Sequence, residues 1–361
     1  MTTGKLNDMQ RGKDRSKTVR DFILYNVGDH PGNITSLTAE KFGFSHQAAY
    51  KHVKTLVDAG QLTACGTTRD RLYSLKSVVT AKAEFPITPK LEEDVVWRRE
   101  VSRKLSESIP ENIRNICHYG FTEMLNNVID HSEGKKAEVD VIRTPVSIRL
   151  YVKDDGVGIF RKIQTSLNLE DERHAILELS KGKLTTDPQH HTGEGIFFTS
   201  RAFDRFRIVS GHLYFSHSTE SGDWLLTRDE EKEVGGTTVI MEIDLNSKRQ
   251  LRHVFDSFAP PDDFGFSKTV VPVMLAQYGE DNLVSRSQAK RLLARFDRFK
   301  EVILDFKGVN SIGQAFADEV FRVFPDQHPA IRLIPINMNK QVRNRWLAVT
   351  GDGRPHGELS H

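Results

Sequence analysis

The stretch FTEMLNNVIDHSEG, residues 121–134, decides the fold of the central part of the chain. In a helix, Glu123, Asn127 and His131 are four residues apart and therefore share one face. A carboxylate can orient or deprotonate an attacking group, a carboxamide oxygen can complete the shell of a phosphate-bound Mg²⁺, and an imidazole can reach a phosphate. Polar residues at this spacing also form solvated stripes on surface helices, so the helix alone leaves both interpretations open.

A glycine-rich turn follows a predicted strand. The sequence YVKDDGVGIF places Asp154, Gly156 and Gly158 directly behind a β-rich stretch that ends at Val152. A carboxylate at this place can accept a hydrogen bond from an exocyclic amine, and glycines let the backbone approach a flat base closely. A pattern of this kind also marks ordinary hairpin turns.

Two further glycine-containing segments lie downstream. In HHTGEGIFFTSRAFD, Gly193 and Gly195 precede a helix that is predicted from Ile196. The free N–H groups at a helix N-terminus attract phosphate, so these glycines mark a candidate phosphate site. Farther along, a Gly-Gly pair leads through Thr237 into the alternating strand TTVIMEI.

In this order the four segments resemble the nucleotide-binding boxes of the GHKL ATPase superfamily, which includes histidine kinases, DNA gyrase and the anti-sigma-factor serine kinases. The motif Glu-x-x-x-Asn, with His four residues later, is most similar to the corresponding motif of the anti-sigma kinases. The resemblance implies an α/β sandwich that binds ATP and Mg²⁺, with Glu123 as catalytic base, Asn127 as Mg²⁺ ligand and Asp154 on the adenine amine. The ATP-binding residues that it implies are Asn127, His131, Asp154, Gly156, Gly158, Lys183, Gly193, Gly195 and Thr237.

The same resemblance implies a mobile lid over ATP. The lid would be formed by residues 160–192, with Lys181, Lys183, His190 and His191. Glu194 departs from the family pattern, because an anionic side chain between the two lid glycines must point away from the phosphates or weaken their binding.

The chain lacks the second element that a phosphorelay histidine kinase requires. Such a kinase carries a phosphorylatable histidine followed by an acid and usually a proline, and neither His52 in KHVKTL nor His118 in CHYGF has these followers. With Glu123 as a working base, the chain would alternatively be a slow ATPase or an anti-sigma-type serine/threonine protein kinase that acts by partner switching. Whether ATP is hydrolysed or only sensed stays open.

The N-terminal 80 residues carry a separate signal. VRDFILYNV, ITSLTAEKFG and SHQAAYKHVKTLVDAG have the apolar spacing of three helices, and Ser45 can cap the third while Gly60 ends it. QLTACGTTRDRLYSL then alternates like two strands around a turn. The order resembles a winged helix-turn-helix domain of bacterial transcription factors, here residues 16–80, preceded by a flexible basic arm, residues 1–15.

In a winged helix-turn-helix domain the third helix enters the major groove of double-stranded DNA. The DNA-binding residues that the resemblance implies are His46, Gln47, Tyr50, Lys51, Lys54, Arg69 and Arg71. Gln47 would read adenine, and the basic residues would meet phosphates. Basic residues exceed acidic ones by five in the first 80 positions, 12 against 7, which favours DNA. Winged helices also dock proteins or dimerise, so a protein partner remains an alternative.

The C-terminal region, residues 262–350, alternates apolar strands with amphipathic helices, as an α/β layer on a small sheet does. VILDFKGV, residues 302–309, resembles the strand and turn before the regulatory serine of STAS domains. NSIGQAFADEVFRVF resembles the STAS-like domain of unknown function that recurs beside GHKL ATPases. Gly313 begins the helix where the STAS antagonists carry their phosphoacceptor, and Ser311 is the nearby hydroxyl. A domain that docks differently with nucleotide state needs no acceptor.

The chain as a whole is predicted to be a multidomain α+β protein. Between the regions named above lie a linker, residues 81–96, and the GHKL domain, residues 97–250, and the chain ends in a tail, residues 351–361. Cys65 and Cys117 fall in different predicted domains, which favours free thiols and a reducing compartment. No apolar run approaches the roughly 20 residues of a membrane span, so a cytoplasmic protein without membrane contact is expected.

These observations predict an ATP-responsive, DNA-binding transcriptional regulator from a bacterium. Mg-ATP would order the lid, change the packing of the STAS-like domain or of a second subunit, and so alter the spacing of two winged helices on a promoter or operator. A homodimer is expected because palindromic half-sites mirror a twofold axis. A protein partner that binds the STAS-like domain is expected in the partner-switching alternative.

Overall fold

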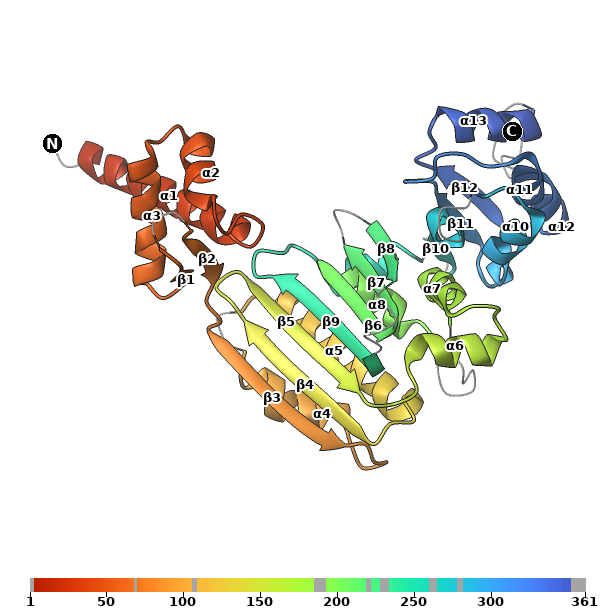
Figure 1. The fold of residues 1–361 in the computed structure, drawn as a ribbon, viewed down its shortest axis with the longest axis horizontal. Coiled ribbons are helices and arrows are strands. Elements are labelled where there is room, and N and C mark those ends of the chain that lie inside the picture. The colour runs from red at the N-terminus through yellow and green to blue at the C-terminus, as the bar shows by residue number, and fades with distance from the viewer. Residues whose placement is uncertain are drawn as a thin grey trace.

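The protein has three structural units, which follow one another along the chain (Figure 1). The computed structural model describes residues 3–67, 70–105, 109–184, 193–218, 222–227, 234–259, 265–277 and 282–351. A helical unit with a two-stranded sheet is followed by a seven-stranded sheet with helices, and then by a unit around a three-stranded sheet. The predicted multidomain α+β architecture is therefore present.

The N-terminal unit contains the three predicted helices and the predicted pair of strands. Its elements are α1 (Thr3–Asn26), α2 (Ile34–Phe42), α3 (His46–Asp58), β1 (Leu62–Cys65) and β2 (Leu72–Leu75), and the two strands pair antiparallel. The hydroxyl of Ser45 caps α3 by accepting from the Ala48 N–H at 3.2 Å, and Gly60 has a left-handed φ of 68°. Both local predictions for the third helix are confirmed.

The first helix is longer than predicted. It begins at Thr3 and therefore includes most of the stretch for which the sequence predicts a flexible arm. Its second half is fixed by packing, because Val19 and Ile23 are fully buried. Residues 3–14 contain several good helix formers, such as Met, Gln, Lys and Arg, so they continue a helix that is already nucleated.

The central sheet has the strand order β3-β4-β5-β9-β6-β7-β8, and neighbouring strands all pair antiparallel. The strands are β3 (Val79–Pro86), β4 (Lys136–Arg143), β5 (Ser147–Asp154), β6 (Arg205–Gly211), β7 (Leu213–Ser218), β8 (Gly222–Thr227) and β9 (Val234–Asp244). Residues 81–86, predicted as linker, belong to the edge strand β3. The linker prediction is wrong there because Ala81, Ala83 and Phe85 alternate toward the core, which gives this segment the period of a half-buried strand.

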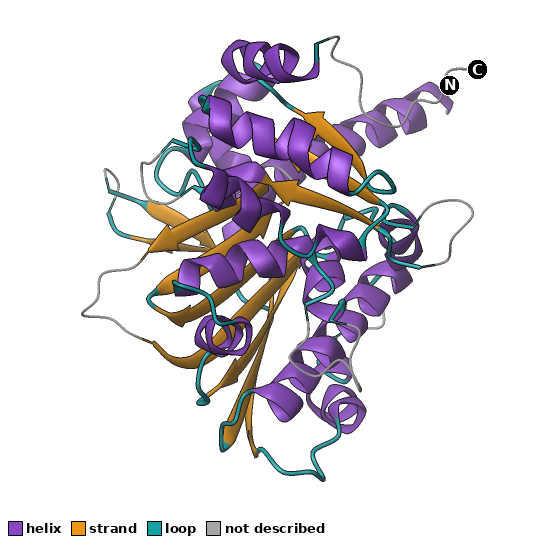
Figure 2. Cartoon of the chain, turned by 90° about the vertical axis from the view of Figure 1, so that its right-hand side faces the viewer, coloured by secondary structure: helices purple, strands orange, loops and turns teal. Residues whose placement is uncertain are grey.

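Helices cover one face of this sheet (Figure 2). They are α4 (Glu93–Val96) with a π-helical continuation (Trp97–Ser102), α5 (Glu111–His131), α8 (Gly195–Ala202) and α9 (Leu251–Asp256). The shorter helices α6 (Ile159–Leu167) and α7 (Glu172–Lys181) follow β5. The apolar side of α5 is buried in the same core as the inner residues of β4 and β5, for example Phe121, Leu125 and Val128.

The C-terminal unit has the predicted alternation of strands and helices around a parallel sheet. Its strands are β10 (Lys268–Pro272), β11 (Glu301–Asp305) and β12 (Arg332–Ile336), in that order. Its helices are α10 (Arg286–Leu293), α11 (Gln314–Asp318) with a π-helical continuation (Glu319–Val323), α12 (Phe324–Gln327) and α13 (Lys340–Thr350), the last of which the sequence did not predict. At the start of α11, Gly313 is the capping residue, and the Ser311 hydroxyl donates to Asn282 Oδ1 at 3.5 Å.

The N-terminal unit is joined to the sheet by packing as well as by the chain. Val146, at the turn between β4 and β5, is buried in the same cluster as Val19, Ile23 and Leu56 of the N-terminal unit. Tyr25 of α1 lies beside Asp244 at the end of β9, and burial together with this carboxylate raises the pKa of Tyr25 to about 12. The ends of β5 and β9 therefore support the N-terminal unit.

Cys65 is exposed, Cys117 is buried, and both thiols are free. Among the helices of the described segments, none combines the length and apolar character needed to cross a bilayer.

Candidate functional site

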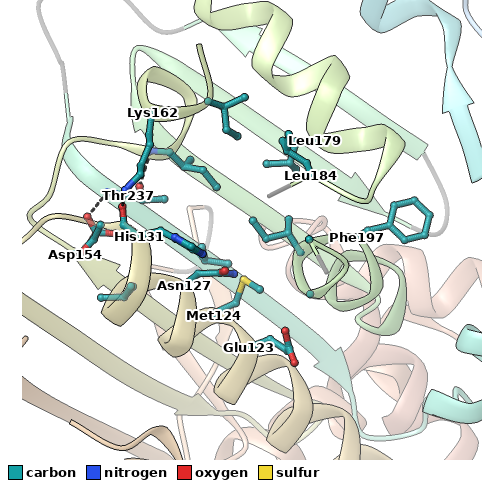
Figure 3. Close-up of a pocket in the computed structure, with 18 of the residues that line it drawn as sticks. Glu123, Met124, Asn127, His131, Asp154, Lys162, Leu179, Leu184, Phe197 and Thr237 are labelled. Carbon is teal, nitrogen blue, oxygen red and sulfur yellow. Dashed lines mark hydrogen bonds between the residues drawn. The ribbon is translucent and has the colours of Figure 1, made fainter. Parts of the chain in front are cut away.

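A cavity lies where α5, the turn after β5 and the N-terminus of α8 meet, with α6 and α7 on its other side (Figure 3). Its polar and glycine lining residues are Glu123, Asn127, His131, Ser132, Asp154, Gly158, Lys162, Gly193, Glu194, Gly195 and Thr237. Its apolar lining residues are Met124, Val128, Ile159, Ile163, Leu179, Leu184, Ile196, Phe197 and Val239. An apolar wall with a few convergent polar groups is the usual composition of a small-molecule site.

The three polar residues of α5 follow one another along the cavity wall. Figure 3 shows Glu123, Asn127 and His131 in a row on the helix, with Asp154 and Thr237 beyond His131. The Nδ2 of Asn127 is buried and has no hydrogen-bond partner among the described residues. A buried amide donor without a partner costs free energy, so this atom is suited to a ligand oxygen in the cavity.

Asp154 forms the far end of the cavity. Its side chain is buried, and its Oδ1 accepts from the Gly156 N–H at 2.8 Å and from the Thr237 N–H at 3.2 Å. Burial raises the pKa of Asp154, and the two backbone N–H groups oppose this shift. The hydroxyl of Thr237 accepts from the Ile159 N–H at 3.0 Å, so β9 also fixes the start of α6.

Two of the glycines allow contacts that a Cβ atom would prevent. A Cβ on Gly156 would lie 1.9 Å from the carbonyl oxygen of Ser132, which accepts from the Val157 N–H at 3.0 Å. A Cβ on Gly195 would lie 2.1 Å from Oε2 of Glu123. The glycines therefore bring the turn after β5 and the start of α8 directly against the two ends of the polar row on α5.

Glu194 lies in the cavity wall. Burial raises the pKa of its carboxyl group, and Lys183 opposes this shift. Tyr119 lies one turn before Glu123 on α5, and burial, followed by the charges of Glu123 and Glu194, raises the pKa of its phenol. The two carboxylates thus occupy the same end of the cavity, next to the start of α8.

Lys162 is a lining residue that the sequence analysis did not identify. Its ammonium donates to the carbonyl oxygen of His131 at 2.6 Å and to Oε1 of Glu133 at 2.9 Å. It thereby ties α6 to the C-terminal end of α5. The spacing of Ile159, Lys162 and Ile163 on one face of α6 is the signal that could have identified it.

The predicted lid is largely helical, and its lysines lie elsewhere than predicted. Residues 160–184 form α6, α7 and the turns after them, while His190 and His191 lie outside the described residues. Lys183 is not part of the cavity lining, because its ammonium donates to the carbonyl oxygen of Arg298 in the C-terminal unit at 3.0 Å. Lys181 is buried against the same unit.

The predicted DNA-binding residues of α3 are on the surface of the N-terminal unit. His46, Gln47, Lys51 and Lys54 are exposed, and Tyr50 is half-buried. Arg71 of the hairpin is exposed as well, and its guanidinium donates to the Tyr50 hydroxyl at 3.5 Å. Arg69 lies outside the described residues. The start of α3 and the hairpin therefore meet on one side of this unit.

Residues 288–343 match the STAS-like domain of unknown function (DUF4325). The match runs from within α10 to the start of α13, so the chain contains a STAS-like domain, as its sequence predicts. A comparison with curated proteins finds no match for the chain.

Proposed function

We propose that the protein is an ATP-responsive, DNA-binding transcriptional regulator. In this proposal the seven-stranded sheet and its helices form a GHKL-type domain that binds Mg-ATP. The N-terminal unit is a winged helix-turn-helix domain that binds promoter or operator DNA as part of a homodimer, and the STAS-like domain takes part in the response. The compartment would be the bacterial cytoplasm.

One observation carries the proposal for the nucleotide. The cavity gathers residues from four segments that are far apart in the sequence, namely α5, the turn after β5, the start of α8 and the start of β9. These are the same four segments, in the same order, that resemble the GHKL boxes. Chance motifs would have no reason to meet at one cavity.

The residues present fit Mg-ATP. Asp154 is buried with one oxygen held by two backbone N–H groups, which suits acceptance of a hydrogen bond from an exocyclic amine. The carboxamide of Asn127 has a buried donor that no described residue pairs with, which could bind a phosphate oxygen, and an oxygen that could join the shell of Mg²⁺. The N-terminus of α8 would supply N–H groups to phosphate. Mg²⁺ would supply charge neutralisation of the phosphates.

Two strands offer a mechanical link between this cavity and the DNA-binding unit. β5 runs from the turn that buries Val146 in the N-terminal unit to Asp154 in the cavity. β9 runs in the opposite direction, from Thr237 in the cavity to Asp244 beside Tyr25. A change at the cavity can therefore reach the orientation of α3 through two packed, hydrogen-bonded strands.

The test is DNA binding by the purified protein with and without Mg-ATP, on the DNA upstream of its own coding sequence. Asn127→Ala serves as the nucleotide-blind variant, and Lys51→Ala as the variant with an altered DNA surface. We expect an ATP-dependent change in DNA affinity in the wild type only, and weaker DNA binding with unchanged ATP affinity in Lys51→Ala. Lack of DNA binding in every nucleotide state would refute the regulator.

The position of Glu123 favours a second candidate function. Its carboxylate lies against the start of α8, where the phosphates would be, which suits a slow ATPase or a serine/threonine kinase of the anti-sigma type. Glu123→Ala with retained ATP binding and lost ADP production would support this function. Unchanged ADP production in that variant would exclude Glu123 as the base.

A further inference from the structure

The C-terminal end of α7 and the residues after it contact two different parts of the molecule. Leu179 and Leu184 line the cavity. The charged residues beside and between them contact the STAS-like domain instead, namely Glu178, Lys181 and Lys183. This short stretch is therefore a wall shared by the cavity and the STAS-like domain. Figure 1 shows α7 beside β10 of the C-terminal unit.

Lys181 is the centre of the contact, with only 1% of its surface exposed. Its ammonium donates to Oε1 of Glu178 at 2.6 Å and to the carbonyl oxygens of Arg291 and Ala294, at 3.1 and 2.9 Å. These two carbonyls belong to the C-terminal end of α10, where the helix dipole favours a cation. Its own carbonyl oxygen accepts from the Thr269 hydroxyl at 2.7 Å. A buried ammonium needs its three acceptors, which makes the docked geometry specific.

Two arginines of the STAS-like domain complete the contact. Arg295 donates to Oε2 of Glu178 at 3.0 Å and to the carbonyl oxygen of Lys183 at 2.6 Å. Arg298 donates to the same Lys183 carbonyl at 2.8 Å. The STAS-like domain therefore holds the backbone at Lys181 and Lys183 directly, and does not merely contact side chains.

The held backbone continues into the cavity. The N–H of Leu184 donates to the carbonyl oxygen of Gly193 at 3.0 Å. Gly193 is followed by Glu194 and by Gly195, which lies against Glu123. A continuous path of backbone and hydrogen bonds thus connects the arginines of the STAS-like domain with the start of α8.

We infer that the STAS-like domain is a built-in regulator of the cavity, and that the buried contact of Lys181 with Arg291 and Ala294 is the clamp that holds it in place. When docked, it fixes the wall of Leu179 and Leu184 and the start of α8 in the nucleotide-binding arrangement. Release of the domain loosens this wall and lowers nucleotide affinity, and bound nucleotide in turn holds the domain in place. The part that concerns the nucleotide rests on the proposed function, that the cavity binds Mg-ATP.

The direction of this coupling follows from where the contacts lie. All described residues that line the cavity belong to positions 123–239, so the docked domain does not block it. Among the described residues, the domain contacts the outer side of the wall, through the carbonyl oxygens of Lys181 and Lys183 and the side chain of Glu178. Fixing a wall without filling the cavity removes part of the ordering cost of binding, so docking favours the ligand.

The test compares three variants of the full-length protein by equilibrium titration with Mg-ATP. Lys181→Met removes the buried ammonium, and Arg298→Ala removes one donor from an exposed side chain. Lys290→Ala is the matched control, because Lys290 is an exposed cation on α10 outside the contact. We expect affinity to fall about tenfold or more in Lys181→Met, less in Arg298→Ala, and not at all in Lys290→Ala. Unfolding of the STAS-like domain in Lys181→Met also releases the clamp, so the expectation is unchanged.

Hydrogen exchange without nucleotide gives a second readout, which separates the clamp from the proposed function. Amides of α8 should exchange faster in Lys181→Met than in the wild type, while those of β4 and β5 stay protected. If the wild type does not bind Mg-ATP, the proposed function fails, and the clamp is then tested only by the hydrogen exchange of the α8 amides. Unchanged exchange in α8 would overturn the clamp, and so would wild-type affinity in Lys181→Met.

Discussion

Alanine at Gly156 should mainly lower the stability of the protein, whereas alanine at Gly195 should mainly disturb the cavity. A Cβ on Gly156 would lie 1.9 Å from the carbonyl oxygen of Ser132, and a Cβ on Gly195 would lie 2.1 Å from Oε2 of Glu123. Since real Cβ contacts are essentially never shorter than 3.0 Å, the obstructing atom must move by at least 3.0 − 1.9 = 1.1 Å or 3.0 − 2.1 = 0.9 Å. The two displacements are nearly equal, but the atoms that must move are different.

The free energy of unfolding should distinguish the two sites. At Gly156 the obstacle is backbone that also accepts from the Val157 N–H, so overpacking costs about 1–3 kcal/mol and the weakened hydrogen bond about 1 kcal/mol more. At Gly195 the obstacle is the end of the flexible Glu123 side chain. Gly195 itself lies in the first turn of α8, where alanine is more favourable than glycine, so the loss of stability stays below about 1 kcal/mol. For a domain of this size the midpoints of thermal unfolding should differ by about 5–10 °C.

Gly195→Ala should impair nucleotide binding or turnover although it changes stability little. The variant stays folded but displaces the carboxylate of Glu123, so ADP production, or Mg-ATP binding where no turnover occurs, should decrease. Gly235→Ala is the matched control, because a Cβ there meets no atom of the described residues within 4 Å. Thermal unfolding and nucleotide titration of the three variants measure both effects. Equal stability of Gly156→Ala and Gly195→Ala would refute the assignment of the obstacles.

Three further predictions concern charged groups. Burial lowers the pKa of Lys181 to about 8 from 10.5, so between these pH values the unfolded chain binds more protons and stability should rise with pH in the wild type. This rise should be absent from pH-dependent denaturation curves of Lys181→Met. Burial raises the pKa of Asp223, but Arg201 and His217 outweigh the effect of burial and hold this pKa well below its usual range. Asp223→Asn should therefore cost about 3–5 kcal/mol near neutral pH, and less in strong acid, where the wild type loses this contribution as the carboxylate is protonated. Lys51→Ala should weaken DNA binding at all sequences and reduce the salt slope of the affinity by about one, whereas an unchanged slope would place Lys51 outside the phosphate contacts.

Local features of the chain were predictable because they depend on residues that are close in the sequence. The row of Glu123, Asn127 and His131 follows from helix geometry alone, and so does the capping of α3 by Ser45. The alternation of strands and helices in the C-terminal unit follows from hydrophobic periodicity. The sequence motifs also indicated which segments share the cavity, although their roles in nucleotide binding remain predictions.

Other features depend on partners that are distant in the sequence. The segment called a linker is a strand because β3 pairs with β4, and Lys82 pairs with Glu138 at a separation of 56 residues. The alternation of apolar and polar residues in β3 was the available signal, but Pro86 at its end and Pro89 after it suggested a loop.

The sequence by itself determined the presence of the three N-terminal helices and of α5, the cap of α3 and the order of the nucleotide-box-like segments, because these arise from short-range periodicity and local hydrogen bonding. Only the tertiary structure decided which way the lysines near the end of α7 point. Both were predicted over the cavity, yet the ammonium of Lys181 is bound by carbonyls 110 and 113 residues away in the STAS-like domain. A long cationic side chain is directed by the acceptors that surround it, and in this protein the fold supplies those acceptors from another domain.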